Sequence, residues 1–269
     1  MSLSTTARLR TAGALLAVSA FALAGCSGSD SDSDDSAASD SGDGSTKTIT
    51  IFAAASLQGP LDTVAKDFTK AHPEYEVKPI VYDGSQALAT QAIDGADVDV
   101  LAFASEKSLE PVTEAGITDD SKIFATNTLE IAATPGNPKG IKTFDDLTKS
   151  GVSVVTCASE VPCGQATDKV EDATGVTLKP VSEETNVTSV VNRVAEGEAD
   201  AGLVYTTDVT AAGDKLEGVD FPEADEAVNK YPVAVSTKSK DPEGAQAFED
   251  YLLSDDGQKV LDEAGFGAP

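Results

Sequence analysis

A β-strand gives way to a helix within residues 48–57, which read Thr-Ile-Thr-Ile-Phe-Ala-Ala-Ala-Ser-Leu. The alternating, β-branched residues at 48–52 predict a strand. Apolar residues at helical spacing follow Ser56, and Pro60 suits the first turn of that helix because its missing N–H costs little there. The Ser56 hydroxyl is therefore either an ordinary N-cap or, together with the free N–H groups of the helix, a donor to an anion.

The same arrangement returns once, around Ser85. A strand is predicted at 75–82, and Asp-Gly-Ser-Gln at 83–86 leads into a helical pattern at 87–93. A further strand is predicted at 98–103. Two seryl N-caps at equivalent ends of parallel strands should face one crevice, as ligand sites in open α/β sheets do.

Strands and helices alternate through the rest of the chain, which predicts an α/β fold with parallel-dominated sheets. The length favours two lobes, with hinge strands near 127–134 and 230–237. We expect lobe 1 to comprise 48–128 and 234–269, and lobe 2 to be the inserted segment 129–233. The other expected strands are 152–156, 176–181 and 201–205, and the other expected helices are 105–115, 143–149, 166–173, 187–195, 242–253 and 254–264.

The N-terminus has the form of a secretion signal. Arg8 and Arg10 precede an apolar run at 12–24 that is too short to span a bilayer. Leu-Ala-Gly-Cys at 23–26 resembles the lipobox of bacterial lipoproteins, which predicts a signal peptide at 1–26 and lipidation of Cys26. The alternative is an ordinary signal peptide with an incidental cysteine.

Residues 27–47 have a composition that cannot bury a core, since they are mainly Ser, Asp, Gly and Ala with six aspartates. This segment is predicted to be a flexible acidic tether. A lipid anchor followed by a tether places the folded part outside the cytoplasm, anchored to the cell membrane.

Charge and histidine content narrow the function classes. The net charge is −27, and removal of Arg8 and Arg10 with the signal peptide makes it −29. Nucleic acid is excluded as a partner because phosphate binding needs clustered Lys and Arg. His72 is the one histidine, which argues against a zinc site and against a Ser-His-Asp triad.

Two cysteines remain after Cys26. An extracytoplasmic location permits a disulfide between Cys157 and Cys163. A thiol–disulfide enzyme is a weaker alternative, because the six-residue separation departs from Cys-x-x-Cys and no basic residue flanks the pair to lower a thiol pKa.

Six short segments, in order along the chain, resemble one known family. They are Ile-Phe-Ala-Ala-Ala-Ser-Leu at 51–57, Gly-Ser-x-x-Leu-Ala-x-Gln at 84–91, Ala-Asp-Val-Asp-Val at 96–100, Val-Pro-x-Gly at 161–164, Gly-Leu-Val-Tyr at 202–205 and Tyr-Pro-Val-Ala at 231–234. With them the chain resembles the molybdate-binding components of bacterial ABC importers. The resemblance covers most of residues 47–267 and implies the two-lobed periplasmic binding-protein fold of the second topological type.

The resemblance implies five ligand contacts. Ser56 and Ser85 would offer hydroxyls and nearby backbone N–H groups from the first lobe. Cys163 and Val187 would donate backbone N–H groups from helix starts in the second lobe, and Tyr205 would donate its phenolic O–H. Without the family pattern, Val187 reads as a core valine and Tyr205 as a buried strand aromatic.

Two positions depart from the family pattern. Gln86 stands where many members carry a small hydroxyl residue, which leaves that corner of the site open. Cys163 stands where members usually have Ala, and its side chain should matter little unless a disulfide reshapes the loop.

The implied function is capture of molybdate, and of tungstate, for delivery to an ABC permease and its ATPase. The chain is then a monomeric binding protein without catalysis or cofactor, and molybdenum enters only as the bound oxyanion. A binder of another oxyanion such as sulfate is the alternative. A hydrolase using Ser56 or Ser85 lacks a base, since His72 lies in neither motif.

Overall fold

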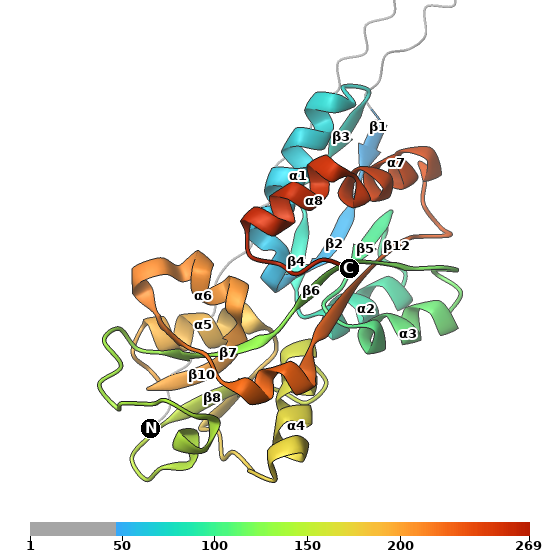
Figure 1. Cartoon of the computed structure of the whole chain (residues 1–269). Coiled ribbons are helices and arrows are strands. Elements are labelled where there is room, and N and C mark those ends of the chain that lie inside the picture. Colours follow the sequence, from blue (N-terminus) through green and yellow to red (C-terminus); the bar gives the residue numbers. More distant parts are fainter. Residues whose placement is uncertain (1–46) are drawn as a thin grey trace, which may run out of the picture. The chain divides into compact units, whose positions relative to one another are not determined.

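The computed structural model describes residues 47–269 (Figure 1). The predicted signal peptide, Cys26 and the tether up to residue 46 lie outside the described residues. The tether was expected to include Lys47, but this residue begins the first strand, β1 (Lys47–Ile49), and its N–H donates to Glu74 O at 3.0 Å. The expected tether is therefore one residue too long. Within residues 47–269, no helix is both long and apolar enough to cross a membrane.

The first five-stranded sheet has the order β4-β2-β5-β12-β6. Parallel pairs join β2 to β4 and to β5, and antiparallel pairs join β12 to β5 and to β6. Its strands are β2 (Ile51–Ala54), β4 (Val81–Asp83), β5 (Val100–Ala102), β6 (Lys122–Asn127) and β12 (Asn229–Val235). A separate parallel pair is formed by β1 (Lys47–Ile49) and β3 (Tyr75–Val77).

Helices cover both faces of this sheet because its strands are apolar on both sides. In β2, Ile51 and Ala53 pack with α1, α7 and α8, whereas Phe52 packs with α2 and α3 on the other face (Figure 1). The helices are α1 (Gln58–Ala71), α2 (Ser85–Ile93), α3 (Glu106–Glu114), α7 (Pro242–Leu253) and α8 (Asp255–Glu263). Such two-sided burial is usual for parallel strands.

The second five-stranded sheet has the order β11-β7-β10-β8-β9 and its own hydrophobic core. The pairs β8–β9 and β8–β10 are parallel, and β7 pairs antiparallel with β10 and β11. The strands are β7 (Leu129–Ala133), β8 (Val154–Cys157), β9 (Ser182–Glu184), β10 (Ala201–Tyr205) and β11 (Glu217–Val219). The helices are α4 (Pro162–Thr174), α5 (Val187–Ala195) and α6 (Thr206–Ala212).

Two strands carry the chain between the sheets. The chain leaves the first sheet at the end of β6 and enters the second sheet at β7, with Thr128 as the single residue between them. It returns to the first sheet at the start of β12. Asn127 and Asn229 pair across β6 and β12 at this crossing. Short 3₁₀ turns complete the described part: η1 (Ala55–Leu57), η2 (Phe144–Thr148), η3 (Gly213–Lys215) and η4 (Pro222–Ala227).

Several predicted elements are wrong in detail. The strand expected at 75–82 is split into β3 and β4, and the strand expected at 127–134 is preceded by β6, which periodicity did not reveal. Residues 176–181 form no strand, and β9 follows at Ser182–Glu184 instead. These strands have only three to six residues, so their pairing partners, rather than a local pattern, set their positions.

Candidate functional site

All five predicted contact residues line one small cavity, although they come from five separate segments of the chain. The cavity has a volume of about 10 Å³ as measured by the centre of a water-sized sphere, which is about the space that one water molecule needs. Its walls come from both sheets and include Ser56, Ser85, Cys163, Val187 and Tyr205, with Ala54, Ala55, Asp83, Gly84, Ala104, Val161, Pro162 and Asn186.

Ser56 lies in η1, directly after β2, and is buried. The expectation that Ser56 is an N-cap is wrong, because Leu57 is the N-cap of α1 and no side-chain capping bond forms there. The 3₁₀ turn moves the start of the α-helix past Ser56. Its hydroxyl instead lies 3.1 Å from the hydroxyl of Tyr231.

Ser85 is the first residue of α2 and is fully buried. Gly84 is the N-cap here, so the second expected seryl cap is also wrong. The Ser85 hydroxyl accepts a hydrogen bond from Ala104 N at 3.0 Å, which fixes it at the end of β5. A Cβ on Gly84 would come within 2.2 Å of Thr185 O, so only glycine allows the backbone beside α5 to approach this closely.

Cys163 and Val187 lie at the starts of α4 and α5. N–H groups in the first turn of a helix have no acceptor within the helix, and they carry partial positive charge. Asn186 caps α5 by accepting from Ser189 N at 2.9 Å. A disulfide joins Cys163 to Cys157 at the end of β8 and closes the loop before α4.

Tyr205 ends β10 and is 1% exposed. Its hydroxyl oxygen accepts a hydrogen bond from the amide of Asn229 at 3.0 Å. Burial raises the pKa of Tyr205 well above its ordinary value, so this hydroxyl keeps its proton. Asp208 accepts from Tyr205 N at 2.9 Å, and burial raises the pKa of this carboxyl to about 7.

Hydrogen bonds join the two sheets on either side of the cavity. Gln86 donates from its amide to Thr185 O at 2.9 Å, and Asn186 donates to the Asp83 carboxylate at 3.1 Å. Gln86 therefore bridges to the second sheet and is not part of the cavity wall. Its Oε1 atom is buried and has no partner among the described residues.

Asp83 is the one charged side chain that the described part of the chain contributes to the cavity wall. Its carboxylate already accepts from Gly84 N and from Asn186. Any anion in this cavity would thus be held by neutral hydroxyls and helix N–H groups, an arrangement typical of helix-terminus anion sites.

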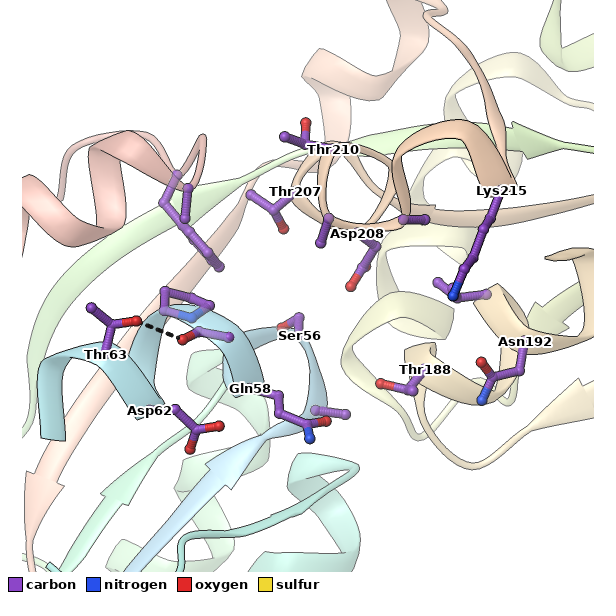
Figure 2. Close-up of a pocket in the computed structure, with 18 of the residues that line it drawn as sticks. Ser56, Gln58, Asp62, Thr63, Thr188, Asn192, Thr207, Asp208, Thr210 and Lys215 are labelled. Atoms are coloured by element: carbon purple, nitrogen blue, oxygen red, sulfur yellow. Dashed lines mark hydrogen bonds between the residues drawn. The ribbon is translucent and has the colours of Figure 1, made fainter. Parts of the chain in front are cut away.

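A much larger groove of about 1080 Å³ opens beside the cavity and shares Ser56 with it (Figure 2). Figure 2 shows Ser56 facing the gap between α1 and α6, with Thr207 and Asp208 across from it. Among residues 47–269, the groove wall has one basic residue, Lys215, and four acidic ones: Asp62, Glu196, Asp208 and Glu263. This negative lining disfavours an anion in the groove, so the small cavity is the better anion site.

Three residues around the cavity were not anticipated from the sequence. Asn127, Asn229 and Tyr231 are buried on the crossing strands and hydrogen-bond to residues of both sheets. Asparagine is disfavoured within strands, so an asparagine in each crossing strand could have indicated a special role from the sequence alone. The hydrogen-bond partners of these side chains could not have been found in this way.

The sequence matches the family model of bacterial extracellular solute-binding proteins over residues 49–267. The chain is similar to the molybdate-binding protein ModA of Mycobacterium tuberculosis H37Rv, with 44% identity over 222 residues covering 82% of this chain and 85% of that protein.

Solved structures show the same fold at lower identity. The periplasmic molybdate-binding protein of Azotobacter vinelandii has a TM-score of 0.73 at 20% identity, over 82% of this chain and 99% of that one. The sulfate-binding protein SubI of M. tuberculosis H37Rv has a TM-score of 0.71 at 20% identity, over 82% and 86%. Because the two scores are so close, likeness of fold does not separate the two ligands.

Proposed function

The chain belongs to the bacterial extracellular solute-binding protein family, and from this premise we propose that it captures molybdate for delivery to an ABC importer. The proposal includes tungstate, because a donor set fixed for one tetrahedral dianion suits another of the same shape. The 44% identity to a mycobacterial molybdate-binding protein supports molybdate over sulfate as the main ligand.

One observation carries the proposal most strongly. Five donors proposed for a tetrahedral dianion, from Ser56, Ser85, Cys163, Val187 and Tyr205, line a single cavity. Desolvation of a dianion is costly, and the site must replace water with several donors that all point inward. Hydroxyls and first-turn N–H groups meet that need without a cationic side chain.

Selectivity follows from the same donor set. The proposed contacts supply donors, whereas a partly protonated phosphate also needs an acceptor for its own proton. The carboxylate of Asp83 in the cavity wall is already engaged by Gly84 N and Asn186. Sulfate carries the same charge as molybdate but is smaller, so a site of fixed size would hold it more loosely.

The finer features belong to this proposal as well. We propose that the protein is lipidated at Cys26, tethered by residues 27–46 and monomeric, and that it meets its permease and ATPase at the outer face of the cell membrane. We also propose that the two sheets are the cores of two lobes that close on the ligand. The second lobe was expected at 129–233, but β12 pairs in the first sheet from Asn229 onward, so we assign 48–128 with 229–269 to the first lobe and 129–228 to the second. Closure would then form the surface that the permease reads.

Calorimetry with molybdate, tungstate, sulfate and phosphate tests the proposal. Ser56→Ala and Ser85→Ala should each weaken molybdate binding by roughly 1.5–3 kcal/mol, the range for hydrogen bonds to charged groups. Thr63→Ala in α1 is a control outside the cavity wall and should leave binding unchanged. Tighter binding of sulfate than of molybdate would favour the alternative, and unchanged molybdate affinity in both serine variants would remove the site assignment.

A further inference from the structure

The oxygen atoms of the cavity hydroxyls are already hydrogen-bonded to donors of the protein. Tyr205 Oη accepts from Asn229 Nδ2 at 3.0 Å, and Ser85 Oγ accepts from Ala104 N at 3.0 Å. The Ser85 hydroxyl donates to no other group within residues 47–269, whereas the Tyr205 hydroxyl has the hydroxyl of Tyr231 as a second neighbour there, competing with the cavity for its proton. A hydroxyl whose oxygen is occupied by a donor has its proton left to give, and both residues border the cavity.

The Ser56 hydroxyl can likewise accept a hydrogen bond and keep its own proton for the cavity, in this case through Tyr231. The two hydroxyls lie 3.1 Å apart, and either geometry of donation fits this distance. Asn127 Nδ2 lies 3.5 Å from Tyr231 Oη and approaches it as a donor. Because the Tyr231 oxygen accepts from the Asn127 amide, the Tyr231 O–H is oriented to donate to the Ser56 oxygen. The Ser56 proton is then left for the cavity.

Both asparagines are fixed by further bonds on the crossing strands. Asn229 Nδ2 also faces Ala104 O at 2.8 Å and Pro162 O at 3.4 Å. Those carbonyl acceptors require the amide nitrogen, rather than the amide oxygen, to point toward Tyr205. Asn127 donates to Thr207 Oγ1 at 2.8 Å, while its oxygen accepts from Thr128 N, so its orientation is set as well.

We propose that Asn229 and Tyr231 are positioning residues that direct the O–H groups of Tyr205 and Ser56 into the cavity and make both of them donors to the oxyanion. Asn127 sets the direction of Tyr231 in turn. This inference rests on the proposed function, because its readout is the affinity for molybdate.

The first test compares Asn229→Asp with Asn229→Leu across pH 6 to 8.5 by calorimetry. Once ionised, the carboxylate that Asn229→Asp introduces can only accept, so it would accept the Tyr205 O–H as a hydrogen bond, turn it away from the cavity and repel the anion. When protonated, the same carboxyl can donate to Tyr205 Oη again. The side chain that Asn229→Leu introduces offers no donor at any pH.

We expect Asn229→Asp to bind molybdate at least about 100-fold more weakly than the parent at high pH. At low pH it should regain affinity and exceed Asn229→Leu by about tenfold. Equal affinity of the two variants at low pH would mean that the new carboxyl acts only through its charge and not as a hydrogen-bond donor. That result would overturn the proposal.

Other titratable groups lie around Asn229, so the affinity of each variant must be compared with that of the parent at the same pH. Tyr205 and Tyr231 surround Asn229, and Asp208 lies behind Tyr205. On the far side, charged residues line a second groove beside Asn229: Glu106, Lys107, Glu110, Asp168, Lys169, Asp172 and Lys230. Asn192→Asp, exposed in the groove of Figure 2, adds the same charge outside the cavity and should show no regained affinity at low pH.

The second test is a double-mutant cycle between Tyr231→Phe and Ser56→Ala. If Tyr231 acts through Ser56, Tyr231→Phe should weaken molybdate binding several-fold in the parent and hardly at all in the Ser56→Ala background. Equal losses in both backgrounds would show a purely structural role for Tyr231. This cycle also decides the matter if thermal unfolding shows that the Asn229 variants do not fold.

The parent protein separates the two possible failures. If the parent does not bind molybdate, the proposed function fails. If the parent binds molybdate but the Asn229 pair and the Tyr231 cycle behave as structural changes, the positioning role alone fails.

Discussion

Gly84 lies beside the cavity, where the start of α2 comes close to the backbone before α5. Its φ of −59° is open to any residue, so the need for glycine comes from the neighbouring backbone and not from its own conformation. A Cβ there would meet Thr185 O at 2.2 Å. The close approach lets the start of α2 and the start of α5 face one cavity.

Gly84→Ala should therefore lower molybdate affinity by about tenfold or more while leaving each sheet folded. The added methyl group would push Thr185 away and hold the two helix starts apart. Gly59→Ala is the matched control, because nothing lies within 4 Å of the added Cβ and the residue sits inside α1. That variant should bind as the parent does, and a Gly84→Ala protein with parental affinity would contradict the importance of this contact.

Glu130 illustrates a pH effect at a single residue of β7. Burial, and then the nearby Asp220 charge, raise the pKa of this carboxyl from 4.5 to about 7. Between these two values the folded protein keeps a proton that the unfolded chain has released. The free energy of unfolding therefore falls as pH rises through this window and levels off above about 7.

Glu130→Gln should remove this dependence. Relative to the variant, the parent should lose roughly 1–3 kcal/mol of stability between pH 4.5 and 7.5, measured by urea unfolding at several pH values. A constant difference between parent and variant across the series would mean that Glu130 titrates normally. The substitution tests the carboxyl alone, because no hydrogen bond to the Glu130 side chain is present within residues 47–269.

At the scale of elements, the loop between β8 and α4 is held at two points. The disulfide joins Cys157 to Cys163 across a separation of six residues. Gly164 lies so near this loop that a Cβ would meet Ala158 O at 1.9 Å. Together these contacts fix where α4 starts, and therefore where its first N–H groups point.

Replacement of both Cys157 and Cys163 by Ala should lower the free energy of unfolding by about 2 kcal/mol, as expected for a short closed loop. Molybdate affinity should fall too, because the start of α4 gains freedom. Dithiothreitol should lower the melting temperature of the parent and leave that of the double variant unchanged. A parent insensitive to the reductant would show that the bond adds nothing to stability.

At the scale of the whole described part, the two sheets meet through a few polar bridges around a small cavity. Gln86 to Thr185 is one bridge, and Asn186 to Asp83 is another. A bridge that exists only when the sheets are together favours the ligand-bound arrangement, and it slows release without contributing to either core.

Gln86→Ala should raise the dissociation rate of molybdate by a few-fold and leave unliganded stability within about 0.5 kcal/mol of the parent. Stopped-flow displacement by tungstate measures the rate, and thermal unfolding measures the stability. Gln91→Ala, an exposed glutamine of the same helix, is the control. If both variants release molybdate at the parental rate, the bridge has no part in closure.

The local sequence pattern was enough to predict the helices and strands whose periodicity and boundary residues lie within or next to the element itself. The helices at 187–195 and 242–253 and the strand at 201–205 have the predicted bounds, because apolar periodicity, caps and Gly or Pro boundaries all lie within a few residues. The side chain of Asn186, directly before the helix at 187–195, caps that helix. The α/β class followed from the alternation of such elements.

Tertiary structure alone decided the short strands and the environment of each donor. The strand β9 and the split of β3 from β4 depend on which neighbour offers a backbone to pair with. The Tyr231–Ser56 contact and the Asn229–Tyr205 hydrogen bond join residues that are far apart in the sequence. The N-caps are Leu57 and Gly84 rather than the two serines, and at Leu57 a 3₁₀ turn before the helix causes the shift. A sequence records which side chains can donate or accept, but a hydrogen bond also needs a partner at about 3 Å, and only the packed chain supplies that distance.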